Sequence, residues 1–175
     1  MIADLGTGSG AIAIALATEL PDVLVWATDA SPEALEVARA NVAGCGQTRV
    51  RLSEGSWFAA LPETLQGELA LVVSNPPYIA DHEVASLPDE VVGHEPRAAL
   101  VSGPTGLEAI EELVSAAPRW LAPGASLVVE IAPHQSDAAR VLAEAAGFVD
   151  VDVRDDLTGR PRVLVARSRP SSTRR

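Results

Sequence analysis

The segment Asn75-Pro76-Pro77-Tyr78 places an amide side chain, two prolines and an aromatic ring directly after an apolar run at residues 69–74. The apolar run is typical of a buried strand. Because proline cannot donate a hydrogen bond to a neighbouring strand, the strand must end here, with Asn75 at its carboxyl edge. Ligands bind at that edge in open α/β sheets, so the segment is a candidate site. Considered alone, it is also explained by a strand-ending turn, in which Asn-Pro and Pro-Pro are common.

A glycine-rich loop, Asp-Leu-Gly-Thr-Gly-Ser-Gly at residues 4–10, lies between a short apolar piece and a run of apolar helix formers at residues 11–17. Such a loop brings backbone N–H groups close to a ligand and directs the N-terminus of a helix toward it. Asp29 ends the next apolar run along the chain. A carboxylate at that strand end can accept hydrogen bonds from both hydroxyls of a ribose. The two features together predict a cofactor that contains a nucleoside.

The glycine loop alone does not distinguish NAD(H) from S-adenosylmethionine. Gly6, Gly8 and Ala11 satisfy the loose dinucleotide pattern, and tight packing at a strand–helix turn would account for one or two of the glycines. Asp4, just before the first glycine, favours S-adenosylmethionine, because a negative charge there is unfavourable for a pyrophosphate. Ser56-Trp57-Phe58 follows the third strand, where an adenine could be sandwiched, and the Asn-Pro-Pro-Tyr segment follows the fourth. The order and strand-end positions of these features agree with S-adenosylmethionine.

Strand-like and helix-like segments alternate along most of the chain. We expect strands at residues 1–5, 23–28, 50–52, 69–74, 125–131, 148–153 and 163–166, and helices at residues 11–17, 32–42, 107–121 and 135–146. This alternation predicts a parallel sheet with helices on both faces. No helix separates the last two strands, so we expect them to be antiparallel neighbours. The expected fold is α/β, with a mostly parallel seven-stranded sheet and an antiparallel edge strand.

Residues 79–106 contain three prolines and show no extended helical or strand periodicity until the helix that follows. Irregular stretches of this length inside a compact domain are usually functional lids or binding segments. We therefore expect an irregular segment directly after the Asn-Pro-Pro-Tyr turn.

The composition is that of one globular domain of 175 residues, in which 47% of residues are hydrophobic and only 3% are aromatic. Cys45 is the single cysteine, which excludes an internal disulfide and fits a cytoplasmic enzyme. No apolar run reaches the length of a membrane span, and the N-terminus has no signal-peptide pattern. His82, His94 and His134 have no metal-ligand spacing, so we expect no metal site.

The formal net charge is −11, and the chain contains arginine but no lysine. Four of the arginines fall in a Pro/Ser-rich end that we expect to be disordered: Arg167, Arg169, Arg174 and Arg175. A nucleic-acid-binding protein needs a concentrated basic surface to neutralise phosphates. The charge therefore argues against DNA or RNA as the main partner.

The motifs in this order resemble the HemK-type protein-(glutamine-N5) methyltransferases, which modify the glutamine of the Gly-Gly-Gln loop of peptide chain release factors. The matching residues are 4–13, Trp57-Phe58, 73–79, Glu95-Pro96 with Ala99-Leu100, Arg154-Asp155 and 159–163. The similarity extends to about Arg167. DNA adenine-N6 methyltransferases share the Asn-Pro-Pro-Tyr motif, but the extension to Ile79 and the Glu95-Pro96 pair favour glutamine.

The resemblance implies a class I S-adenosylmethionine-dependent methyltransferase fold and a role for each matching residue. Asn75, Pro76, Pro77 and Tyr78 would form the catalytic site. The Asn75 side-chain oxygen and the Pro76 carbonyl would accept the two N–H groups of the substrate amide, and Tyr78 would stack on it. The cofactor would be bound by Asp4, Gly6, Thr7, Gly8, Ser9, Gly10, Asp29, Ser56, Trp57 and Asn75, with Asp29 on the ribose and Trp57 over the adenine.

Two departures from the family pattern are visible. Ser56 stands where the family commonly has aspartate, so an adenine amino group would lose charge-assisted binding. The family also carries an N-terminal helical domain that helps recognise the release factor, whereas only three residues precede Asp4 here. We interpret residues 1–167 as the catalytic domain alone, with a disordered tail at 168–175, and expect a fragment or a mis-assigned start.

The sequence alone leaves three possible functions open. The first is glutamine-N5 methylation of a release factor by a cytoplasmic, monomeric enzyme that uses S-adenosylmethionine. The second is adenine-N6 methylation of a nucleic acid, which uses similar chemistry on a planar amino group but fits the acidic charge poorly. The third is a non-catalytic fragment that binds S-adenosylmethionine.

Overall fold

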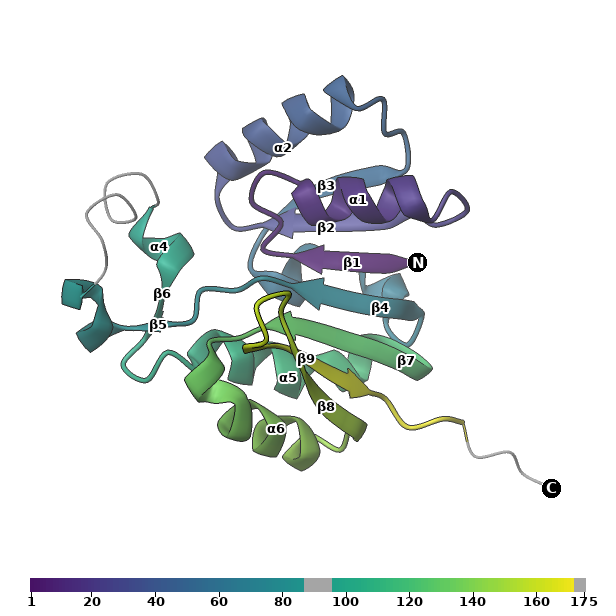
Figure 1. Cartoon of the computed structure of the whole chain (residues 1–175). Helices are drawn as coiled ribbons and strands as arrows, with labels where there is room; N and C mark the ends of the chain where they lie inside the picture. Colours follow the sequence, from purple (N-terminus) through teal and green to yellow (C-terminus); the bar gives the residue numbers. More distant parts are fainter. Residues whose placement is uncertain (87–95, 172–175) are drawn as a thin grey trace.

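A seven-stranded sheet forms the centre of the protein. The computed structural model describes residues 1–86 and 96–171. The sheet contains β1 (Ile2–Leu5), β2 (Val25–Asp29), β3 (Val50–Glu54), β4 (Leu69–Ser74), β7 (Leu121–Glu130), β8 (Val149–Asp155) and β9 (Pro161–Arg167). Their order across the sheet is β3-β2-β1-β4-β7-β9-β8 (Figure 1). The expected seven-stranded α/β fold is therefore confirmed.

Helices cover both faces of this sheet (Figure 1). They are α1 (Ala11–Glu19), α2 (Pro32–Gly44), α5 (Glu108–Trp120) and α6 (Ser136–Ala145). Ile2 of β1 packs with α1 and α2, whereas its neighbours Ala3 and Leu5 pack with α5 and α6. This split follows from the strand geometry, in which successive side chains point to opposite faces.

The start of α2 follows the local signals in the sequence. The Ser31 hydroxyl accepts a hydrogen bond of 3.1 Å from the Ala34 backbone N–H, and Pro32 occupies the first helical turn. Both features satisfy or remove backbone donors that a helix N-terminus leaves unpaired. They fix where the chain turns after β2, and therefore where Asp29 lies.

The order in which the chain adds strands to the sheet reverses between β1 and β4. Strands β2 and β3 follow β1 on one side, whereas β4 and β7 extend the sheet on the other side, and all these pairs are parallel. A crevice forms at the carboxyl ends of strands where the order reverses in this way, and ligands bind there. The loops that follow β1 and β4 leave the sheet at this point, so we expect the crevice between them.

An antiparallel pair closes the β7 side of the sheet. β9 pairs antiparallel with both β7 and β8, so the last two strands are antiparallel neighbours as expected. β8 is the edge strand, and β9 lies between it and β7. This order brings the start of β9 beside the end of β7, at the same edge of the sheet as the crevice.

The stretch after the Asn-Pro-Pro-Tyr segment is more regular than expected. Its described parts contain η3 (Asp81–Ser86), α4 (Arg97–Leu100) and a two-stranded parallel sheet of β5 (Ile79–Ala80) and β6 (Val101–Gly103). These elements are too short for a periodicity to appear in the sequence. Glu95 of the Glu-Pro pair lies outside the described residues, and Pro96 directly precedes α4.

Chain packing continues beyond the expected end of the domain at Arg167. The Ser168 N–H donates to the Ala125 carbonyl at 2.8 Å, and its hydroxyl donates to the Ala122 carbonyl at 2.7 Å. The Arg169 carbonyl accepts from the Gly124 N–H at 3.2 Å. The expectation of a disordered tail from residue 168 is therefore wrong for these two residues, and 172–175 lie outside the described residues.

Candidate active site

Strand register brings the predicted site residues to one edge of the sheet. Leu5 of β1 is paired with Thr28 of β2 on one side and with Ser74 of β4 on the other. The Ser74 hydroxyl also donates to the Leu5 carbonyl at 2.7 Å. Gly6 and Asn75 therefore follow paired positions, and the glycine loop and the Asn-Pro-Pro-Tyr segment leave the sheet side by side.

Asp4 lies beneath the glycine loop with 0% of its surface exposed. Its Oδ2 accepts a hydrogen bond of 2.6 Å from the Thr7 hydroxyl and one of 3.0 Å from the Ala13 N–H. Its Oδ1 is buried and has no hydrogen-bond partner in the described residues. Asp4 thus fixes the loop from within, and one of its carboxylate oxygens has no hydrogen-bond partner among the described residues.

The burial of Asp4 has an electrostatic consequence. Burial raises the pKa of its carboxyl to about 6, although the bonds from Thr7 and Ala13 act in the opposite direction. The neighbouring charge of Asp29 adds to the rise. Two carboxylates close together, one with an unpartnered oxygen, form a site that favours a positively charged ligand.

We expect Asp4→Asn to gain stability over the parent chain as the pH rises. Burial raises the folded-state pKa from 3.8 to about 6, so ionising Asp4 costs folding free energy. Protonated Asp4 carries no such cost, so the free energy of unfolding of the parent chain is highest below about pH 4. It falls by about 3 kcal/mol as the pH rises through about 6. Denaturant unfolding of both chains without ligand should show a difference that grows between about pH 4 and pH 7. A difference independent of pH would contradict the burial argument.

Gly6 is confined by the aromatic residue that follows β3. A Cβ atom on Gly6 would lie 3.1 Å from the Trp57 ring, and the backbone has φ +69°. Both conditions disfavour a larger residue here, because its Cβ would crowd the Trp57 ring and strain the backbone. By contrast, a Cβ on Gly8 would meet nothing within 4 Å, so the loop is open on that side.

The side chains of the loop point in different directions. Thr7 is buried on Asp4, whereas Ser9 is exposed and its carbonyl accepts a hydrogen bond of 2.9 Å from Asn41. Gly10 directly precedes α1 in a left-handed conformation with φ 83°. What the loop presents to a ligand is therefore mainly backbone, as expected for a glycine loop before a helix.

Asp29 fastens the glycine loop to the start of α2. Its Oδ2 accepts from the Gly8 N–H at 2.9 Å, and its Oδ1 accepts from the Ser31 N–H at 2.9 Å. Each carboxylate oxygen can accept a further hydrogen bond, so the predicted bonds to ribose hydroxyls remain compatible with this geometry. The anchoring of the loop by Asp29 was not predicted from the sequence.

The residues after β3 divide between the candidate site and the core. The Trp57 ring lies against Gly6, and its Nε1 donates to Glu112 of α5 at 3.1 Å. Ser56 is exposed and directly precedes η1 (Trp57–Ala60). Phe58 is only 5% exposed and stacks on Trp120, with ring centroids 5.6 Å apart. The Phe58 ring therefore belongs to the core, and of the two aromatic residues only Trp57 lies beside the glycine loop.

The Asn-Pro-Pro-Tyr segment presents its first residue and buries its second. Asn75 is exposed, Pro76 is buried, and Pro77 and Tyr78 are partly buried. The Tyr78 carbonyl accepts a hydrogen bond of 2.9 Å from the Gln135 side chain. The segment is therefore held from behind while the Asn75 side chain stays accessible.

Gln135 is a site residue that the sequence did not reveal. It is 3% exposed and ends η4 (Pro133–Gln135). Its Nε2 donates to the carbonyls of Tyr78 and of Gly106, at 2.9 and 3.0 Å, and its Oε1 accepts from the Ala132 N–H at 3.0 Å. A Cβ on Gly106 would lie 2.6 Å from the Tyr78 carbonyl oxygen. Gln135 and Gly106 together hold the backbone of Tyr78 in place, and we call this arrangement the backbone lock.

We expect Gln135→Glu to destabilise this backbone lock. The change replaces the Nε2 donor with an oxygen that faces two carbonyl oxygens, in a buried position where the loss costs about 2–4 kcal/mol. Urea unfolding measures the loss. Gln47→Glu is the matched control, because among the described residues the Nε2 of Gln47 donates to the exposed Thr18 hydroxyl alone, at a position where water can replace the lost bond. Equal small losses in both variants would contradict the lock.

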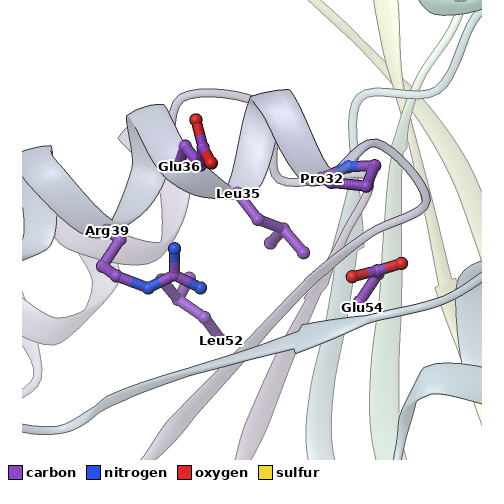
Figure 2. Close-up of a pocket in the computed structure, with 6 residues that line it drawn as sticks. All are labelled: Pro32, Leu35, Glu36, Arg39, Leu52 and Glu54. Carbon is purple, nitrogen blue, oxygen red and sulfur yellow. The ribbon is translucent and has the colours of Figure 1, made fainter.

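A separate hollow of about 240 Å³ lies between α2 and β3. Figure 2 shows Leu35 pointing from α2 toward β3, and Glu36, Arg39 and Glu54 are among the other residues that line the hollow. None of the predicted site residues lines it. We place the candidate site at the carboxyl ends of the strands rather than in this hollow. There the glycine loop and the Asn-Pro-Pro-Tyr segment lie side by side, above the Asp4 carboxylate.

Metal and membrane features can be described for residues 1–86 and 96–171. Within these ranges no group of three or more His, Cys, Asp or Glu side chains is placed to hold a metal ion. In the same part of the chain no helix combines the length and apolar character needed to cross a bilayer.

The sheet order, the glycine loop after β1 and the acid that ends β2 define a class I S-adenosylmethionine-dependent methyltransferase fold. A methyltransferase from Pyrococcus furiosus has the same fold, with a TM-score of 0.71 at 19% identity over 97% of this chain and 75% of that chain. The ribosomal protein L11 methylase from Lactobacillus delbrueckii gives a TM-score of 0.68 at 25% identity over 97% and 69%. The family model for the methyltransferase small domain matches residues 1–105, and the chain belongs to this family.

Curated relatives carry the name that the motifs indicated. A release factor glutamine methyltransferase from Cereibacter sphaeroides is 46% identical over 167 residues, covering 95% of this chain and 59% of that protein. The protein of the same name from Synechocystis sp. is 44% identical over 168 residues, covering 94% and 56%. The resemblance to the HemK-type methyltransferases is thus confirmed. The chain spans a little over half the length of these relatives.

Proposed function

We propose that this protein transfers a methyl group from S-adenosylmethionine to the side-chain amide nitrogen of the glutamine in the Gly-Gly-Gln loop of peptide chain release factors. The observation that carries the proposal is the pairing of Leu5 with Ser74. It sets a glycine loop suited to the cofactor directly beside an Asn-Pro-Pro-Tyr segment suited to a planar amide. The relatives named above support the choice of substrate.

The residues present fit S-adenosylmethionine. Its sulfonium and amino groups are positive, and the buried Asp4 offers an unpartnered oxygen beneath the loop. Bound there, the cofactor supplies an electrophilic methyl group. The backbone of Gly6, Thr7, Gly8, Ser9 and Gly10 would surround it, Asp29 would accept from the ribose, and Ser56 and Trp57 would border the adenine. A cation close to Asp4 would lower the pKa of this carboxyl and recover the free energy that its burial costs.

The Asn-Pro-Pro-Tyr segment supplies positioning for the acceptor. An amide nitrogen is a poor nucleophile because its lone pair is delocalised. The exposed Asn75 Oδ1 and the Pro76 carbonyl would accept the two N–H groups of the glutamine and direct its nitrogen toward the methyl group. Tyr78 would form a wall against the planar amide. Catalysis of this kind depends on orientation and electrostatics, and the proton can leave after the transfer without a strong base.

The partners follow from the substrate. A release factor acts in translation, so we place the protein in the cytoplasm and propose that it acts as a monomer. We propose residues 1–167 as the catalytic domain, extended by the packed Ser168 and Arg169.

Adenine-N6 methylation of a nucleic acid is the second candidate, because the Asn-Pro-Pro-Tyr motif suits any planar amino group. The net charge of −11 argues against it.

One assay separates these functions. The 175-residue chain is incubated with methyl-labelled S-adenosylmethionine and either a release factor or adenine-containing DNA, in parallel. Label on the release factor that disappears when its Gly-Gly-Gln glutamine is replaced by alanine supports the proposal. Label on DNA alone would replace it with the adenine function. Cofactor binding without any methyl transfer would leave only the non-catalytic function.

A further inference from the structure

Two charged side chains meet at the hydroxyl of Tyr78. The hydroxyl lies 3.4 Å from Glu130 Oε1 and 3.5 Å from Arg162 Nη1. Glu130 and Arg162 are themselves 4.0 Å apart, with only 35% and 22% of their side chains exposed. Neither charged residue belongs to the glycine loop or to the Asn-Pro-Pro-Tyr segment, so the three come from distant parts of the sequence.

The backbone of the sheet brings these residues together. Ser74 of β4 is paired with Val129 of β7, and Glu130 of β7 is paired with Val163 of β9. The Ile131 N–H also donates to the Arg162 carbonyl at 2.9 Å. Strand pairing, rather than the reach of long flexible side chains, therefore sets Glu130 and Arg162 beside the crevice.

Arg162 is held from its other side by Asp156 in the turn between β8 and β9. Asp156 Oδ2 lies 3.8 Å from Arg162 Nε. Its Oδ1 accepts from the Thr158 hydroxyl at 2.6 Å, from the Thr158 N–H at 2.8 Å and from the Arg160 N–H at 3.1 Å. These bonds, led by the one from the Thr158 hydroxyl, lower the pKa of Asp156 to about 2. The turn thus offers Arg162 a fixed negative charge at every physiological pH.

Tyr78 stays protonated in this setting. Burial and then the charge of Glu130 raise the pKa of its phenol, while Arg162 acts in the opposite direction. The hydroxyl can therefore donate to Glu130 and accept from Arg162. Both distances are longer than the usual values of about 2.8 Å for an O–H donor and about 2.9 Å for an N–H donor, so each contact is individually weak. The carbonyl of the same residue is held by Gln135 at 2.9 Å, so Tyr78 is restrained at both its backbone and its hydroxyl.

We propose that Glu130 and Arg162 are positioning residues of the methyl-acceptor site. They hold the edge of the Tyr78 ring, so that its face stays turned to the planar amide of the substrate. This inference rests on the proposed function for the acceptor role of Tyr78, but not for the coupling of the three side chains. That coupling can be measured without substrate.

The first measurement uses the tyrosine itself. The chain contains a single tyrosine, so an ultraviolet difference titration reports Tyr78 alone. Glu130→Gln should lower the pKa of the phenol, because it removes a negative charge that opposes ionisation. Arg162→Met should raise that pKa, because it removes the opposing positive charge. Arg160→Met is the control, because Arg160 also pairs with Asp156 yet has no contact with Tyr78 among the described residues. A tyrosine pKa unmoved by both test variants would overturn the coupling.

The second measurement is a double-mutant cycle on methyl transfer. Arg162→Met and Tyr78→Phe should each lower kcat/KM for the release factor about ten-fold, and the double variant should lose no more than either one. The affinity for S-adenosylmethionine should not change in any of them, and Arg160→Met should retain full activity. Additive losses, or a fully active Arg162→Met, would overturn the positioning role.

The two measurements also keep the inference apart from the proposed function. If the unmodified chain methylates no release factor while the tyrosine pKa responds as described, then the proposed function fails and the coupling stands. If the chain is active and the tyrosine pKa does not respond, then the positioning role fails and the proposed function stands.

Discussion

Replacing Asn75 with alanine should lower the turnover number for methyl transfer by about 10²- to 10³-fold, the size of effect seen when a positioned polar group is removed from an active site. Asn75 is exposed at the end of β4, so the truncation leaves no cavity and should preserve the fold. Cofactor affinity should change much less, because the glycine loop after β1 and Asp29 at the end of β2 supply most of the predicted cofactor contacts. Single-turnover kinetics with the release factor and calorimetry with S-adenosylmethionine measure the two quantities separately.

A matched variant sharpens this prediction. Asn75→Asp retains an acceptor oxygen at the same position, so it should keep more activity than Asn75→Ala. That order would indicate that the side-chain oxygen accepts a hydrogen bond from the substrate amide. Normal turnover in Asn75→Ala would end the proposal that this segment is the acceptor site.

Replacing Asp29 with alanine should weaken S-adenosylmethionine binding about 100-fold, because hydrogen bonds to a charged acceptor contribute about 1.5–3 kcal/mol each. The variant would lose the predicted bonds to the ribose. It would also lose the observed bonds from the Gly8 and Ser31 N–H groups, at 2.9 Å each. Calorimetric titration of the cofactor measures the change.

Two controls separate these contributions. Asp22→Ala removes the same charge from an exposed turn before β2, so it should leave affinity unchanged. An analogue of the cofactor without ribose hydroxyls should bind weakly to the parent chain, and its further loss of affinity in Asp29→Ala measures the contribution of the bonds to Gly8 and Ser31. Unchanged affinity of Asp29→Ala for the natural cofactor would contradict the ribose assignment.

Local features of the fold were predictable from the sequence because their physical causes are local. The apolar runs, the glycine loop before α1 and the Ser31-Pro32 start of α2 each depend on a few consecutive residues. The antiparallel pairing of β8 and β9 followed from the absence of a helix between them. The parallel order then set Asn75 at the carboxyl edge, beside the loop that follows β1.

What the sequence could not reveal depends on contacts between distant segments. Gln135 reaches Tyr78 and Gly106 only because the loop after β7 folds back behind the segment after β4. Arg162 reaches Tyr78 only because β9 inserts between β7 and β8. No periodicity or capping signal marks such residues, because the strand order decides their neighbours.

The residues after β3 show that turn geometry also depends on packing. Trp57 and Phe58 are consecutive aromatic residues, and residue type alone does not tell which one faces the crevice. The backbone at Trp57 has φ 43°, and the tight turn sends the Phe58 ring into the core against Trp120. Turn geometry of this kind is set by packing beneath the chain.

The most direct test of the account is to locate the methyl group by tandem mass spectrometry. A purified release factor is incubated with the 175-residue chain and S-adenosylmethionine, and its peptides are then sequenced. We expect one added methyl group on the side-chain amide of the Gly-Gly-Gln glutamine, and none when the chain carries Asn75→Ala. A methyl group on any other residue, or an unmodified glutamine under conditions in which the chain binds the cofactor, would contradict the account.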